Sequence, residues 1–151
     1  MNALFAGAVA ATIVAANAVA GDVVGRSTAD ILRTCAPAGS YRTMNVGKYR
    51  PACVISLRHP IEGVVECALR DAMMLKLAKP DVNVADISHE IQRLTTEGAT
   101  PTIRYKAWLA SAVYENPAMF ADVIKTDFFT AEEAFAAVAR RLELTLLAAR
   151  Q

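Results

Sequence analysis

The chain contains few residues that could do chemistry, and its three cysteines are the most conspicuous of them. Cys35, Cys53 and Cys67 occur with His59 between the last two, which would give a Cys3His set for zinc. Structural zinc sites use ligands two to four residues apart in paired knuckles. Here 17, 5 and 7 residues separate the four candidates, so the spacing does not favour a metal site.

A disulfide accounts for two of these cysteines more simply, because thiols of exported proteins tend to pair. We expect a Cys35–Cys53 bridge across a loop, and a Cys53–Cys67 bridge is the competing pair. With the first pairing, Cys67 would be a buried, free thiol in a helix. In a cytosolic protein all three cysteines would instead be reduced core residues.

Other potential catalytic patterns are incomplete. Gly25-Arg26-Ser27 lacks the first glycine and the lysine of a phosphate loop. His89-Glu90 lacks the second histidine of a metalloprotease helix, because Arg93 stands in its place, and this pair is expected on a solvated helix face. With only two histidines and no G-x-S-x-G turn, the sequence predicts no enzyme, no cofactor and no metal.

The elements that must position these residues are predicted to be helical. Apolar residues recur at helical spacing, capping residues precede the runs, and strand signals are nearly absent. Residues 37–51 hold two prolines and two glycines without a helical period, which predicts an ordered, disulfide-tied loop. Residues 52–58 fit a short strand or a helical turn. We therefore expect an all-α, single-domain bundle of five or six helices, over approximately 29–35, 61–79, 87–98, 101–114, 117–123 and 131–149.

An uncharged stretch over residues 3–20 ends in Ala18-Val19-Ala20, the small-x-small pattern of a signal-peptidase site. We predict a signal peptide at 1–20 and a single helical domain at 21–151, in a periplasmic or secreted protein. A retained membrane helix and an Ala-rich core helix are the alternatives, since the run is just long enough to span a bilayer. A membrane contact is expected only if residues 3–20 are retained.

The formal net charge of +1 gives no global attraction to nucleic acid, so no nucleic-acid partner is expected. Between Asp30 and Glu62 the chain has no acidic residue. This acid-free stretch predicts a contact surface for a protein with an acidic surface, and the alternative is a solvated patch balanced by the acidic C-terminal half. The predicted binding residues are Arg42, Lys48, Tyr49, Arg50 and Arg58.

Several short features together resemble a known family. They are a first helix ending at Cys35, the Ala52-Cys53 pair, residues 61–64, and the run 114–117 before a final Ala-rich helix. Their order resembles the small helical periplasmic immunity proteins that neutralise type VI secreted amidases. The resemblance implies a Cys35–Cys53 bridge and an inhibitory, protein-binding role. Cys67 and the lack of a closing cysteine depart from that family's pattern.

The sequence therefore predicts a non-catalytic bacterial interaction protein of the cell envelope, with immunity-type inhibition as one form. One alternative is a small-molecule carrier or small enzyme with a pocket between helices near Trp108 and Tyr114. Another is a membrane-anchored subunit of an envelope complex. The sequence does not determine the oligomeric state.

Overall fold

The computed structural model describes residues 38–128 and 130–149. The predicted leader, the helix expected near 29–35 and Cys35 lie outside these ranges. Within them every regular element is a helix and there is no strand, which confirms the all-α fold. The elements are α3 (Ala38–Thr43), α4 (Val46–Leu57), α5 (Glu62–Ala78), α6 (Ala85–Glu97), α7 (Pro101–Glu115), the 3₁₀ helices η1 (Pro117–Phe120) and η2 (Val123–Lys125), and α8 (Ala131–Ala148).

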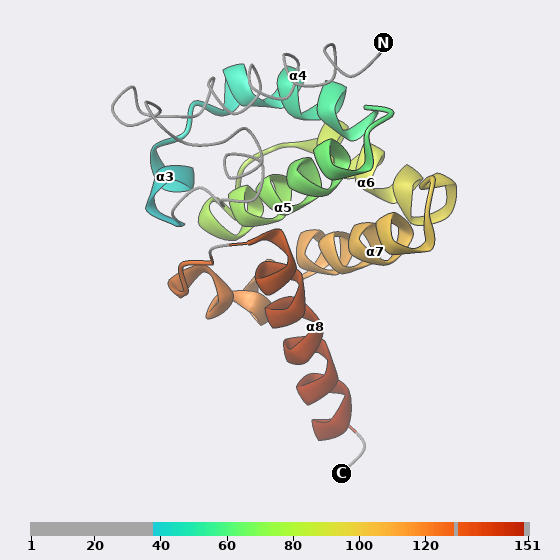
Figure 1. Cartoon of the computed structure of the whole chain (residues 1–151). Helices are drawn as coiled ribbons and strands as arrows, with labels where there is room; N and C mark the ends of the chain where they lie inside the picture. Colours follow the sequence, from blue (N-terminus) through green and yellow to red (C-terminus); the bar gives the residue numbers. More distant parts are fainter. Residues whose placement is uncertain (1–37, 129, 150–151) are drawn as a thin grey trace, which may run out of the picture.

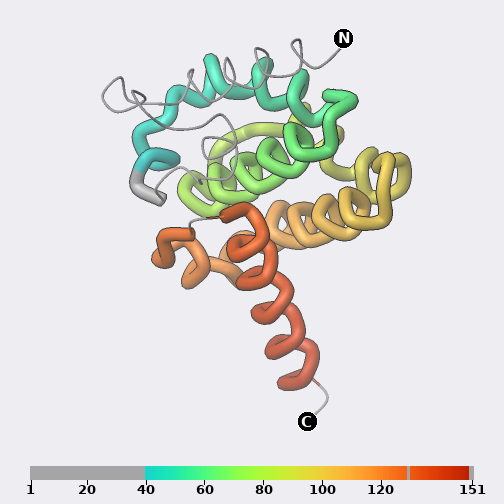
Figure 2. Tube along the Cα trace, viewed as in Figure 1, coloured from blue at the N-terminus to red at the C-terminus, as the bar shows by residue number. Residues whose placement is uncertain are grey.

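Helix α5 is the centre of the bundle. Its residues Leu69, Ala72, Met73 and Leu75 are fully buried, and it packs against α3, α4, α7 and α8. Figure 2 shows α4, α5 and α7 as successive layers. A helix that is apolar on several faces must be covered on several faces, which explains why α5 occupies this position.

Helices α6 and α7 form a tight helical hairpin, and their sequence signals were correctly interpreted. Gly98 ends α6, and a Cβ atom there would lie 2.7 Å from the Leu94 carbonyl oxygen. Thr100 caps α7 by accepting a hydrogen bond from the Ile103 amide, and Pro101 occupies the first helical position. The hairpin holds α7 in a fixed orientation against α5.

The loop expected over residues 37–51 is wrong for the part that is described. That segment forms α3 and the first half of α4, and residues 52–57 continue α4, as the helical alternative for 52–58 expected, rather than forming a strand. Asn45 caps α4 by accepting from the Lys48 amide. The buried residues Tyr49, Cys53, Ser56 and Leu57 recur every three or four positions, so an inward helical stripe outweighs the unfavourable Pro51.

Helix α8 begins as predicted, with the Thr130–Glu133 capping box fully formed. Its first half packs on the bundle through Ala134, Phe135 and Val138, which are buried. Its second half extends past the other helices, and in Figure 1 it projects below them. The apolar run of α8 is therefore longer than the core that it covers.

Candidate protein-interaction surface

The structure disperses the five residues that the sequence assigned to one basic surface. Arg42 and Lys48 are exposed, in the last turn of α3 and the first turn of α4. Neither forms an ion pair with a described residue. Tyr49 is buried at 7% exposure and cannot contact a partner. Arg50 and Arg58 each form an ion pair with a carboxylate of α6.

Arg50 pairs with Asp86 at the start of α6, with 3.1 Å between its Nη2 and Asp86 Oδ1. Burial opposes ionisation of Asp86, but the hydrogen bonds from Arg50 and the backbone outweigh it, and the pKa of the carboxyl is lowered. This pair connects α4 to α6. The charge of Arg50 is consequently much less available to an acidic partner than the sequence suggested.

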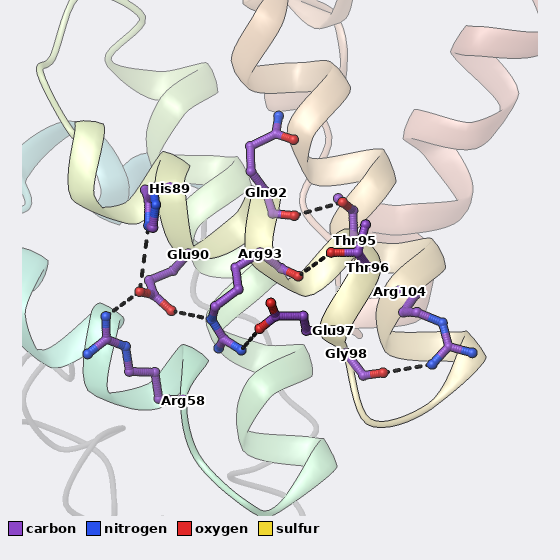
Figure 3. Close-up of polar contacts among 10 residues, drawn as sticks. All are labelled: Arg58, His89, Glu90, Gln92, Arg93, Thr95, Thr96, Glu97, Gly98 and Arg104. Carbon is purple, nitrogen blue, oxygen red and sulfur yellow. Dashed lines mark hydrogen bonds and ion pairs between the residues drawn. The ribbon is translucent and has the colours of Figure 1, made fainter.

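Arg58 pairs with Glu90, a carboxylate that lies almost entirely inside the fold. Figure 3 shows Arg58, which directly follows α4, and Arg93 of α6 converging on Glu90, with Glu97 on the side of Arg93 away from Glu90. The hydrogen bond from Arg58, aided by Arg93, lowers the pKa of Glu90 to about 2 although burial opposes it. The expectation of a solvated His89-Glu90 face is therefore correct for exposed His89 and wrong for Glu90.

The disulfide-tied loop is not supported. Cys53 lies in α4 as a buried, free thiol, and burial raises its pKa to about 12. Its neighbour is the Tyr49 hydroxyl, which is itself buried and has a pKa well above its usual value. Cys67 is half-buried on α5 rather than fully buried. No disulfide joins described residues, and Cys35 lies outside them.

The alternative of a pocket between helices near Trp108 and Tyr114 remains a prediction, and these two side chains do not face each other. Trp108 is 49% exposed on the outer face of α7. Tyr114 lies inward, where its hydroxyl donates to the Ala72 carbonyl oxygen at 3.2 Å. Six residues apart, the two side chains diverge by roughly 120° around the helix. In the described ranges, no three His, Cys, Asp or Glu side chains are grouped to hold a metal either.

Two aromatic rings are the most distinctive feature of the outer surface. Tyr105 and Trp108, here called the aromatic pair, lie one turn apart on α7 with ring centroids 6.1 Å apart and an interplanar angle of 22°. Both are about half exposed. Stacking of this kind orders both rings before any partner arrives. Trp108 lies outside the apolar stripe of α7, and this is the signal in the sequence that could have indicated its exposed position.

The helix beneath the aromatic pair is firmly held. Lys106 is buried at 5% exposure, and its ammonium group donates to Glu66 of α5 and to Glu132 at the start of α8. The same ammonium lies 5.4 Å from the centre of the Phe135 ring. One side chain thus connects three helices. The aromatic pair is carried on a helix whose position is fixed by these contacts and by the cap at Thr100.

Comparison of the chain with family models, with curated proteins and with solved structures finds no match. Within the described residues, no helix combines the length and the hydropathy needed to cross a membrane. The surface of the chain itself therefore has to indicate its function.

Proposed function

We propose that the chain is a non-catalytic protein-binding domain of the bacterial cell envelope. Immunity-type inhibition of a type VI secreted amidase is the concrete form that the sequence resemblance suggests. The aromatic pair is the observation that carries the binding proposal. Tyrosine and tryptophan are the residues most enriched among those that dominate binding energy, and rings that are already stacked lose little entropy on docking.

Charge supports a second, weaker contribution from the exposed Arg42 and Lys48. Arg50 and Arg58 are held in ion pairs with Asp86 and Glu90, whereas Arg42 and Lys48 are exposed and form no ion pair with a described residue. Exposed charges of this kind mainly raise the association rate and depend on salt. The envelope assignment depends on the Ala18-Val19-Ala20 ending of the leader.

The first experiment identifies the partner by site-specific photo-crosslinking in intact cells. A crosslinking amino acid at Trp108 should capture a protein that the same amino acid at Gln92, an exposed position on α6, does not capture. The captured protein is then purified, and its affinity is measured by calorimetry. Trp108→Ala should weaken binding by about 2 kcal/mol, or roughly thirtyfold.

Thr102→Ala is the matched control, because Thr102 is also exposed on α7 but is not part of the aromatic pair. It should leave the affinity unchanged. Arg42→Glu combined with Lys48→Glu should lower the association rate at low salt. Unchanged affinity in Trp108→Ala would refute the assigned surface. An amidase among the captured proteins should lose peptidoglycan hydrolysis in the presence of the chain, and retained hydrolysis would refute the immunity form.

A further inference from the structure

The second half of α8 presents large apolar side chains to solvent. Leu144, Leu146 and Leu147 are each more than half exposed, and Figure 2 shows this part of the helix extending beyond the bundle. A helix that is apolar outside the fold's own core is expected to pack on something else. The residues of α8 between these leucines and the bundle indicate which surface packs against this part of the helix.

Four exposed residues form a straight seam along α8: Ala136, Arg140, Glu143 and Leu147. Their spacing of four, three and four positions places them within about 60° of one another around the helix. This α8 seam lies on the side opposite the buried Phe135 and Val138. Spacing of this kind is the pattern by which one helix packs along another.

The two charges in the α8 seam have no partner among the residues that the structure describes. Neither Arg140 nor Glu143 forms a hydrogen bond or ion pair with a described residue. By contrast, the adjacent Arg141 is held by the Met119 carbonyl oxygen at 3.0 Å. Arg140 and Glu143 are therefore available to an opposing surface that carries the same two charges in the reverse order.

We propose that a second copy of this chain docks on the α8 seam as an antiparallel helix pair. In the antiparallel register, Arg140 faces the partner's Glu143 and Ala136 faces the partner's Leu147. Two-fold symmetry repeats each contact, so the interface is self-complementary. The leucine of each copy fills the space left by the small alanine of the other. A parallel pair would instead place Arg140 against the partner's Arg140, and like charges disfavour it.

The length of the seam sets the strength of this dimer. Eleven residue steps from Ala136 to Leu147 correspond to about 16 Å of helix. A helix pair of that length buries less than the roughly 1,600 Å² of a standard stable interface. The dimer should therefore dissociate as the protein is diluted, with monomer and dimer both populated at micromolar concentrations.

Sedimentation of the full chain over about a hundredfold range of concentration tests the self-association. Wild type should shift from monomer to dimer. Arg140→Glu alone and Glu143→Arg alone should each remain monomeric, because each places like charges across the seam. The double exchange Arg140→Glu with Glu143→Arg should restore the dimer, and a mixture of the two single variants should form a heterodimer. Glu115→Lys, an exposed charge reversal at the end of α7, should dimerise like wild type.

Engineered cysteines test the register. A chain carrying both Ala136→Cys and Leu147→Cys should form an interchain disulfide under mild oxidation, above the background that the native cysteines give in wild type. Either substitution alone should not, because the two equivalent positions would lie about 16 Å apart along the pair. A wild-type chain that is monomeric at every concentration overturns the proposal. So does a dimer that persists in Arg140→Glu or crosslinks equally through Ala136→Cys alone.

Discussion

The environment that the sequence suggests for Glu90 differs from the environment that Glu90 has in the structure. In the sequence it follows the polar residues Ser88 and His89, as on a solvated face. In the fold it is 2% exposed, while the Arg58 side chain that meets it remains 62% exposed. A buried carboxylate requires a charged partner or many hydrogen bonds. Its partner Arg58 directly follows α4, 32 positions earlier in the chain, and local sequence reasoning cannot find such a pairing.

We predict that Glu90→Gln lowers the free energy of unfolding at neutral pH by about 1–3 kcal/mol, because it removes a charge-assisted contact while keeping the side chain's shape. Screening of the exposed Arg58 favours the lower end of this range. The folded-state pKa of Glu90 is depressed, from 4.5 to about 2. Its ionised form therefore stabilises the fold fully above pH 4.5 and progressively less as the pH falls toward 2.

Urea unfolding of wild type and Glu90→Gln at a series of pH values checks this. The stability difference should be constant near neutrality and should shrink as the solution is acidified below the ordinary pKa of glutamate. Glu97→Gln is the matched control, since Glu97 also pairs with Arg93 but is exposed. It should have a much smaller effect. Equal losses in the two variants would contradict the role assigned to the buried carboxylate.

The predicted binding residues show that contacts between residues on different helices could not be predicted from the sequence. Charge was correctly assigned to Arg50 and Arg58, but their partners Asp86 and Glu90 lie on α6, and proximity across helices is not visible in a local pattern. Tyr49 was assigned to the surface because its segment was taken for a loop. Once that segment is helical, Tyr49 and Cys53 fall on the same inward stripe.

Among the elements, helices with explicit end signals were predicted well. Thr100-Pro101 and the Thr130–Glu133 capping box begin α7 and α8 where the sequence placed them. Helix α4 was missed because Pro51 lies inside it. Proline removes one backbone hydrogen bond and crowds the carbonyl four residues earlier, here that of Gly47. The tertiary burial of the inward stripe outweighs that local cost.

Replacing this proline gives a test at the level of the helix. Pro51 is exposed, so Pro51→Ala removes no core packing. It relieves an interior-helix penalty of about 3 kcal/mol and loses about 1 kcal/mol through a more flexible unfolded chain. We expect a net stabilisation of about 1–2 kcal/mol, observed as a higher melting temperature.

The matched control is Pro101→Ala, at the first position of α7. Proline fits that position without loss of a hydrogen bond, so this substitution should leave stability unchanged or lower it slightly. Thermal unfolding followed by circular dichroism measures both variants. A gain in Pro101→Ala as large as that in Pro51→Ala would show that the benefit does not come from repairing α4.

For the whole molecule, the sequence determined the fold class but not which residues form the outer surface. Helical periodicity and caps are local, so an all-α bundle could be predicted from them. Which apolar residues remain outside depends on where the bundle ends. The apolar run of α8 was predicted as one continuous face, yet only its first half finds a core. The aromatic pair on α7 and the α8 seam both lie outside the core that the bundle forms. They are separate surfaces, and each has its own test.

Processing of the N-terminal segment determines the compartment in which these surfaces act. The charge-free run over residues 3–20 and the small residues Ala18 and Ala20 fit the requirements of signal peptidase. We therefore expect the chain recovered from a periplasmic or culture fraction to begin at Gly21. Intact-mass spectrometry of that material measures this directly.

An Ala20→Arg substitution should block processing, because a long charged side chain does not fit the narrow pocket that accepts alanine, and the precursor should then accumulate. Asn17→Ala leaves the small-x-small ending intact and should be processed as wild type is. A chain that still begins at Met1 in the exported fraction would refute cleavage and favour a retained helix, with the domain and its two surfaces held at the membrane.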